Sequence, residues 1–521
     1  MLLSTALFLS PLFLSAAASP IEPRADPAPV KETNCNGKSY VYEELAGFGI
    51  FPGDARDKFG DTIGGVGSSI ALDKKSWKKK EGKDEAYTGI LYGLPDRGWN
   101  TQGTQNTASR IQKFGVTLTI VDATVAKPAK PNFVMEYLDT IILKGPDGTP
   151  TTGLDADATG HISFPGFPDL PGATYTGDGF GGAGPGGKRI SLDAEGLVLG
   201  DDDTFWVSDE YGPYVYQFDN SGKMIQAIRP VDALIPMRNG AESFSANSPP
   251  IFDASRKVTP GNPDTGRQNN QGFEGLTVSP DGKTLYVLLQ SAARQEGGAA
   301  ALTRRHTRFL QYDISKKTAK YEAEYVVELP VISNGKIAAQ SEVHFISDSQ
   351  FLILARDSGA GHGQSSSTSL YRNADIFDIS KATDIKSATN DKFNGAIANS
   401  ATGVLNAGIT PAAYCPWIEF NNNSELNKFG AHNGGAQDAF LLNEKWEGLA
   451  LAPVAGKFSD NGNKDGEEYY LISLSDNDFI TQNGFINGGQ IPFKDASGFN
   501  LDTQALVFKV RLPKGAKPLE G

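Results

Sequence analysis

The feature that most constrains the fold is a short motif that recurs at long intervals along the 521 residues. The tripeptide Glu-Gly-Leu opens three stretches, beginning at Glu195, Glu274 and Glu447. A weaker copy at Glu342 lacks the glycine, and a diverged copy at residues 64–69 lacks the acid as well. Each copy is followed by a second apolar run with a polar end. The pattern therefore indicates a repeated unit larger than one strand.

The runs that follow each opening are typical of short antiparallel strands. After Glu195, the runs 196–199, 204–208, 214–218 and 224–228 are separated by polar turns and predict a four-stranded meander. The 59 glycines suit a turn-rich β protein, and long helical periodicity is absent. Four-stranded sheets repeated around an axis form a β-propeller, whose first strands line a central channel.

We therefore predict an all-β fold, a β-propeller of four-stranded blades spanning residues 40–513, with a C-terminal tail at 514–521. Six blades are favoured over seven. The openings account for five, and a sixth is expected from residues 40–51, 160–189 or 383–440. The N-terminal strand is expected to close the ring against residues 505–512. Two stacked β-sandwich domains are the competing architecture, but they do not explain why an acid heads each repeat.

The N-terminal sequence indicates export. Residues 1–18 form a short apolar run that ends in small residues, which is typical of a signal peptide, with a short membrane anchor as the alternative. A proline-rich leader is expected at residues 19–39. Cys35 and Cys415, the two cysteines, fit one disulfide in an oxidising compartment, and two free thiols are the alternative. Asn422 begins a glycosylation acceptor, Asn-Asn-Ser. We expect a secreted, extracellular glycoprotein.

The charge restricts the partners. The formal net charge is −13, which disfavours nucleic acid and anionic membranes, because both attract basic surfaces. We expect a monomer that acts on a small molecule.

Acidic residues recur at equivalent places in the repeats. The first strands begin with Glu195, Glu274, Glu342 and Glu447, and the second strands end near Asp96, Asp209, Asp357 and Asp476. A β-bulge at the Glu-Gly step would turn the glutamates toward the channel. Converging carboxylates repel one another unless cations neutralise them, and oxygen ligands of this kind favour Ca²⁺. The predicted metal ligands are Asp96, Glu195, Asp209, Glu274, Glu342, Glu447 and Asp476. The alternative is that each carboxylate caps backbone N–H groups.

Basic residues beside these acids provide the candidate catalytic groups. Arg97 follows Asp96, and Arg356 precedes Asp357. His362 lies in a glycine-rich loop just after them, where it can serve as an acid or base or stay solvated. The catalytic candidates are Arg97, Arg356, Asp357 and His362.

Several of these motifs resemble those of a known family. The Glu-Gly-Leu openings, Gly64-Gly65-Val66, Pro95-Asp96-Arg97-Gly98, Ser208-Asp209-Glu210 and Pro280-Asp281-Gly282 are similar to the phytase-like family described as "esterase-like activity of phytase". The resemblance covers about residues 45–512. It implies a propeller related in architecture to calcium-dependent β-propeller phytases, in exported proteins.

Three functions follow as hypotheses. The leading one is a secreted, calcium-dependent hydrolase of phosphate or carboxylate esters, with a small ester or phosphoester as substrate. The second is a non-catalytic propeller with a structural metal that binds a polymer or a protein. The third is a calcium-dependent lactonase, which differs from the first only in substrate.

Overall fold

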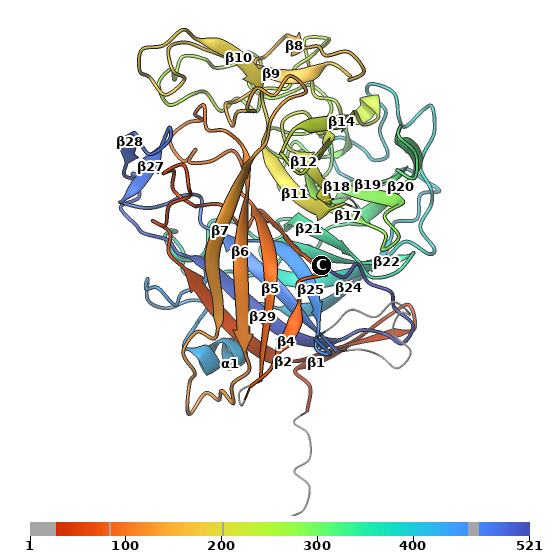
Figure 1. The fold of residues 1–521 in the computed structure, drawn as a ribbon. Helices are drawn as coiled ribbons and strands as arrows, with labels where there is room; N and C mark the ends of the chain where they lie inside the picture. The colour runs from red at the N-terminus through yellow and green to blue at the C-terminus, as the bar shows by residue number, and fades with distance from the viewer. Residues whose placement is uncertain (1–27, 83–84, 201–202, 457–467) are drawn as a thin grey trace, which may run out of the picture.

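The fold is all-β and is built from small, mostly antiparallel sheets (Figure 1). The computed structural model describes residues 28–82, 85–200, 203–456 and 468–521. Helical structure in these ranges is confined to α1 (Asn423–Leu426) and the short 3₁₀ turns η2 (Asp232–Leu234), η3 (Arg294–Glu296) and η4 (Asn427–Phe429). The predicted signal peptide, residues 1–18, lies outside the described residues.

Twenty strands of the described chain form five four-stranded units, numbered here in chain order of their first strands. Unit 1 contains β3 (Ser69–Leu72), β5 (Ala86–Leu94), β6 (Arg110–Thr119) and β7 (Phe133–Ile142). Unit 2 contains β11 (Ala194–Leu199), β12 (Phe205–Asp209), β13 (Val215–Phe218) and β14 (Met224–Ile228). Unit 3 contains β17 (Phe273–Val278), β18 (Thr284–Leu289), β19 (His306–Asp313) and β20 (Lys320–Glu328). Unit 4 contains β21 (Ala339–Phe345), β22 (Gln350–Arg356), β23 (Arg372–Asp378) and β24 (Ala413–Glu419). Unit 5 contains β25 (Lys445–Pro453), β26 (Glu468–Asp476), β29 (Thr503–Arg511) and β2 (Lys38–Phe51).

The meander predicted after Glu195 is unit 2, with strand limits within two residues of those expected. The predicted closure by the N-terminal strand is also confirmed, because β2 pairs with β29 from Val41↔Arg511 to Phe51↔Thr503. A single parallel bridge, Gly49↔Phe133, joins units 5 and 1 into one larger sheet. Two short strands extend that sheet, β1 (Lys31–Cys35) beside β2 and β4 (Lys78–Lys80) beside β5.

The units contact one another in cyclic order. Their first strands are neighbours in the sequence β3, β11, β17, β21, β25 and back to β3. Five large hydrophobic clusters lie between successive units, and the one between units 5 and 1, for example, contains Ile70, Phe114, Ile472 and Val507. Because every unit packs both faces against neighbours, its inner strands contain buried apolar runs, such as residues 351–355 of β22 and 469–472 of β26. The expected count of six blades is not confirmed.

The three segments expected to supply a sixth blade have other roles. Residues 40–51 belong to β2 and complete unit 5. Residues 160–189 contain β8 (His161–Ile162), β9 (Leu170–Tyr175) and most of β10 (Gly187–Ile190), a separate sheet at the top of Figure 1. Residues 383–440 contain the connection into β24, the strand itself and α1. Spacing alone does not distinguish such insertions from a blade.

The two longest insertions lie on the side of the ring where the first strands begin, which we call the entry rim. Strands alternate in direction, so the connections from each second strand to the third, and from each unit to the next, lie at this rim. They carry the β8–β10 sheet, the pair β15 (Met237–Arg238) and β16 (Ala241–Glu242), and the pair β27 (Gly484–Ile486) and β28 (Ile491–Phe493). Long loops carried on a rigid scaffold are where binding sites are commonly found.

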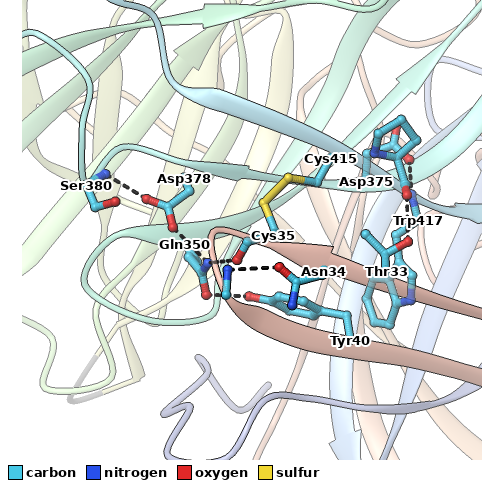
Figure 2. Close-up of a disulfide and its surroundings, with 12 residues drawn as sticks. Thr33, Asn34, Cys35, Tyr40, Gln350, Asp375, Asp378, Ser380, Cys415 and Trp417 are labelled. Atoms are coloured by element: carbon cyan, nitrogen blue, oxygen red, sulfur yellow. Dashed lines mark hydrogen bonds between the residues drawn. A yellow bond between two sulfur atoms is a disulfide. The ribbon is translucent and has the colours of Figure 1, made fainter.

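The N-terminal hairpin is attached to unit 4 by the predicted disulfide. Cys35 in β1 and Cys415 in β24 are bonded across a sequence separation of 380 residues (Figure 2). Ordered structure therefore begins before Tyr40, since β1 lies within the expected leader at residues 19–39. The prolines predicted a leader without regular structure at residues 19–39. They gave no indication that residues 31–35 would pair with β2.

The far end of the ring is covered by the C-terminal segment. Backbone amides of Lys517 and Leu519 donate to carbonyls of Ile346 and Phe345, and Gly521 donates to Leu451. A cavity of about 130 Å³ lies beneath this segment, with Leu197, Leu276, Glu342 and Leu449 among the residues that line it.

Candidate functional site: a buried carboxylate centre

The repeated openings share one local geometry. The pairing of first and second strands slips between Ala194 and Leu197, between Phe273 and Leu276, and between Trp446 and Gly448. These β-bulges place Glu195, Glu274 and Glu447 in the irregular step, as the Glu-Gly sequence predicted. The acids therefore leave the regular alternation of the strand at the entry rim.

The glycine after each glutamate is required by the neighbouring unit. A Cβ on Gly196 would lie 2.6 Å from the carbonyl oxygen of Glu274, and one on Gly448 would lie 3.0 Å from the backbone nitrogen of Ile70. No side chain fits at such distances without moving the backbone of the next unit. The Glu-Gly pair thus sets both the position of the acid and the approach of adjacent first strands.

Carboxylates from three units converge at the entry rim. Two groups of three have oxygen atoms within 4.8 Å of one another: Asp96 with Asp476 and Asp478, and Asp96 with Asp193 and Glu195. Asp96 belongs to both groups and links them. We use the name carboxylate centre for these acids together with the buried glutamates that act on them electrostatically, namely Asp96, Asp193, Glu195, Glu210, Glu274, Glu447, Asp476 and Asp478.

Three cationic side chains contact the centre. Lys445 Nζ lies 2.9 Å from Asp476 and 3.0 Å from Asp478. Arg97 pairs with Asp193 at 2.9 Å, and Arg356 pairs with Glu447 at 2.6 Å. The carboxylates outnumber these cations by more than two to one.

Several oxygens of the centre lack a partner. Both carboxylate oxygens of Glu210, one of Glu274 and one of Glu447 are buried and accept no hydrogen bond within the described structure. Only 1 % of Glu210 is exposed. An ionised carboxylate in this condition is costly, because neither water nor a donor replaces its lost solvation.

The surplus of negative charge raises most of the pKa values. Burial, followed by the charge of Asp193, raises the pKa of Glu210 to about 8. Burial and the neighbouring Glu274 raise the pKa of Glu195 well above its usual range, and burial with Asp476 does the same for Asp96. Asp476 differs: burial favours its neutral form, but Lys445 lowers its pKa. Burial and mutual repulsion therefore favour neutralisation of these carboxylates, by a proton or by a cation.

Two predicted ligands accept several hydrogen bonds and hold the fold. Asp209 accepts from the backbone amides of Asp193, Tyr211 and Gly212 and from the hydroxyl of Tyr216. Glu342 accepts from the hydroxyl of Ser69 and from the backbone amides of Leu276 and Val343. Both follow the alternative stated from sequence, in which an acid caps backbone groups.

Two predicted catalytic residues make no described contact with the carboxylate centre. Asp357 accepts from the hydroxyl of Ser369 and the backbone amide of Leu370. His362 places its ring edge-on against Phe499, with centroids 6.0 Å apart, and burial lowers its pKa. The predicted glycosylation residue, Asn422, caps α1 by accepting from the backbone amide of Ser424.

Sequence reasoning missed four members of the site. Asp193, Glu210, Lys445 and Asp478 all stand within two residues of a predicted ligand, inside motifs already recognised as repeats. They were missed because the prediction considered only positions that recur in several repeats, and each of these residues occurs in only one. A charged residue that occurs in one repeat but not in the others was the signal that could have identified these site residues.

Comparison with known proteins gives one family and one close relative. The family model described as "esterase-like activity of phytase" matches residues 87–479. An "uncharacterized secreted protein" from Arthroderma benhamiae is 56% identical over 481 residues, which are 90% of this chain and 93% of the relative. This chain is likewise a secreted protein. Across the described residues, no helix combines the length and the apolar character needed to span a bilayer.

Two solved structures are distant matches to this chain. A luciferin-regenerating enzyme aligns over 90% of this chain and 97% of its own, with 10% identity and a TM-score of 0.27. A member of the DUF4221 family from Bacteroides vulgatus aligns over 90% and 98%, with 12% identity and a TM-score of 0.22. Neither score is high enough to support an argument about the fold. On the evidence of the family match, which covers most of its length, the chain belongs to the phytase-like family, described as having the esterase-like activity of phytase.

Proposed function

We propose that this protein is a secreted, metal-dependent hydrolase of phosphate or carboxylate esters, with Ca²⁺ held in the carboxylate centre of a five-bladed propeller. The observation that carries the proposal is the buried surplus of carboxylates, above all Glu210, whose two oxygens have no partner. The cyclic contacts of five four-stranded units support the propeller.

The donor set fits a hard divalent cation. The centre offers carboxylate oxygens from several units and neither sulfur nor imidazole within its two compact groups. Such oxygen ligands suit Ca²⁺ better than zinc. Asp96, Asp193 and Glu195 would hold the ion, and Glu210 supplies further negative charge beside Asp193. A bound ion of this kind supplies Lewis acidity, which polarises an ester oxygen and lowers the pKa of a coordinated water.

Two arginines of the chain are placed to bind the negative charge of a substrate. Arg97 is fixed by Asp193 and by the hydroxyl of Tyr211, and Arg356 is fixed by Glu447. Each guanidinium is largely buried yet keeps 10–12% of its side chain exposed. A preorganised guanidinium at such a site stabilises the charge that develops on an ester or phosphoryl oxygen during hydrolysis.

The family supports the same class of reaction. Its description names an esterase-like activity, and the relative from A. benhamiae is named as secreted. Neither name identifies a substrate, so the proposal goes no further than phosphate and carboxylate esters.

The test is hydrolysis by metal-free and Ca²⁺-loaded protein. Aryl phosphates, aryl carboxylates and lactones are assayed after chelation and again after Ca²⁺ is restored. We expect turnover of at least one ester class that disappears on chelation and returns with Ca²⁺. Glu195→Gln should abolish it, and Glu136→Gln, an exposed glutamate on β7, serves as the matched control. If chelation lowered the melting temperature but no ester were hydrolysed, the hydrolase proposal would be rejected and the metal would be structural. Turnover confined to lactones would make the protein a lactonase.

A further inference from the structure

The two carboxylate groups of the centre differ in the cation they already contain. In the first group, which we call the lysine group, Asp96, Asp476 and Asp478 surround the ammonium of Lys445. In the second, which we call the open group, Lys445 reaches only the shared Asp96, at 3.8 Å, and Arg97 pairs with Asp193. The third member is Glu195. The groups share Asp96, as two adjacent cation positions share a bridging ligand.

Lys445 is held firmly in the lysine group. It is the first residue of β25, and its backbone pairs with Asp476 at the end of β26. Its Nζ lies 2.9 Å from Asp476, 3.0 Å from Asp478, 3.8 Å from Asp96 and 3.7 Å from Glu447. An ammonium surrounded by four carboxylates occupies the place that a divalent ion would otherwise take.

The open group retains its demand for positive charge. Arg97 approaches Asp193 from one side, and no cationic side chain of the described structure pairs with Glu195. Glu210 lies beside this group, since its backbone amide donates to the carbonyl of Asp193 at 2.9 Å, and both of its carboxylate oxygens are buried and accept no hydrogen bond in the described structure. An unpartnered, buried carboxylate beside the open group is an observation independent of the cluster itself, and it points to a missing cation there.

We propose that Lys445 is a built-in substitute for a second metal ion, so that the centre binds a single Ca²⁺, in the open group. This inference rests on the metal site of the proposed function and specifies its stoichiometry and position. One bound ion and one tethered ammonium then supply the two cationic centres that a two-metal hydrolase obtains from two ions. Binding of a second ion would require Lys445 to leave its carboxylates.

The first test counts bound Ca²⁺. Metal-free protein is titrated with Ca²⁺ by calorimetry, and the ion content after dialysis is measured by elemental analysis. We expect one Ca²⁺ per chain for the wild type and for Lys445→Arg, and two for Lys445→Met, since Met removes the charge without adding a donor. Lys78→Met, on the exposed strand β4, is the matched control and should bind one.

The outcomes separate this inference from the proposed function. No Ca²⁺ bound by the wild type would overturn both. Two ions bound by the wild type, or only one by a folded Lys445→Met, would overturn the inference and leave the metal site intact.

A second pair of variants keeps the inference testable if Lys445→Met does not fold. Glu195→Gln removes a ligand of the open group, and Asp478→Asn removes a partner of Lys445 only. We expect Glu195→Gln to weaken Ca²⁺ binding by at least about tenfold and Asp478→Asn to weaken it by much less. The reverse order would place the ion in the lysine group and overturn the inference.

Discussion

Two regions of this molecule bury carboxylates in opposite ways. Beside the disulfide, Asp375 accepts hydrogen bonds from the backbone of Trp417 and the hydroxyl of Tyr414. Asp378, in the same region, accepts from the side-chain amide of Gln350 (Figure 2). In the carboxylate centre, the oxygens of Glu210 accept none within the described structure. The carboxylates of both regions are buried, so the two regions differ in the number of hydrogen-bond donors and not in solvent exposure.

The difference separates carboxylates that stabilise the fold from carboxylates that await a ligand. A buried acid with several donors is stabilised in place, and removing it leaves those donors orphaned. A buried acid without donors destabilises the fold until a cation arrives. The disulfide region is therefore expected to lose stability when its groups are changed. In metal-free protein, neutralising an acid of the carboxylate centre is expected to raise stability instead.

The largest effect is expected from the disulfide itself. It joins β1 to β24 across 380 residues, and removing a native disulfide commonly costs about 2–5 kcal/mol. We expect Cys35→Ser with Cys415→Ser to lower the free energy of unfolding by about 4 kcal/mol, measured by urea denaturation. Thr33→Val removes only the neighbouring hydrogen bond to Pro416 and should cost about 1 kcal/mol. Equal losses in the two proteins would show that the hairpin is held by hydrogen bonds alone.

The next effect extends the comparison to a buried base. His344 donates from Nε2 to the carbonyl of Leu519, and burial lowers its pKa to about 4 from 6.5. Below pH 6.5 the unfolded chain takes up a proton that the folded protein refuses until about pH 4, so stability falls as the pH drops through this window. The loss is about 3 kcal/mol. His344→Gln keeps a donor and should remove that part of the pH dependence, as measured by unfolding at pH 4 and pH 7. An unchanged pH dependence in this variant would contradict the assignment.

The sequence predicted the scaffold well because the scaffold repeats. The Glu-Gly-Leu openings follow from the close packing of Gly196 and Gly448 against the next unit, a constraint that recurs in successive units. Strand closure and the disulfide followed from residues 505–512 and from the two cysteines. The blade count was not recoverable, because insertions such as residues 160–189 contain strands of their own.

The site was predicted only in outline because it departs from the repeat. The predicted ligands Asp96, Glu195 and Asp476 fall in two compact groups that share Asp96, and Glu274 and Glu447 act electrostatically on Glu195. Sequence position could not show which acids would find donors, as Asp209 and Glu342 do. That outcome depends on backbone amides brought close by folding, and on hydroxyls such as those of Ser69 and Tyr216.

A direct test of the partnered region is to neutralise Asp375 without changing its shape. Asp375→Asn places an amide group among donors, since the two oxygens together accept from Tyr371, Tyr414, Trp417 and Asn373. We expect a loss of about 2 kcal/mol in the free energy of unfolding, because at least one donor is left unpaired. Chemical denaturation measures it, with Glu136→Gln as a surface control. An unchanged free energy of unfolding would mean that the hydrogen-bond network tolerates an amide. The contrast between Asp375 and the carboxylate centre would then no longer hold.

The smallest effect is expected in the centre, and its sign is the opposite. Glu210→Gln keeps the shape of the side chain and removes a carboxyl whose ionisation in the folded protein is opposed by burial and by the charge of Asp193. In metal-free protein we expect the free energy of unfolding to rise by about 1–2 kcal/mol. The increase in melting temperature caused by Ca²⁺ should become smaller, because a ligand that binds the folded state more weakly stabilises it less at the same concentration. Thermal unfolding of both proteins, with chelator and with saturating Ca²⁺, measures the two quantities together. If Glu210→Gln destabilised the metal-free protein as Asp375→Asn does, then missing donors would not distinguish a ligand site from a structural network. Opposite signs for the two neutralised acids would establish that distinction with side chains of equal burial and matched chemistry.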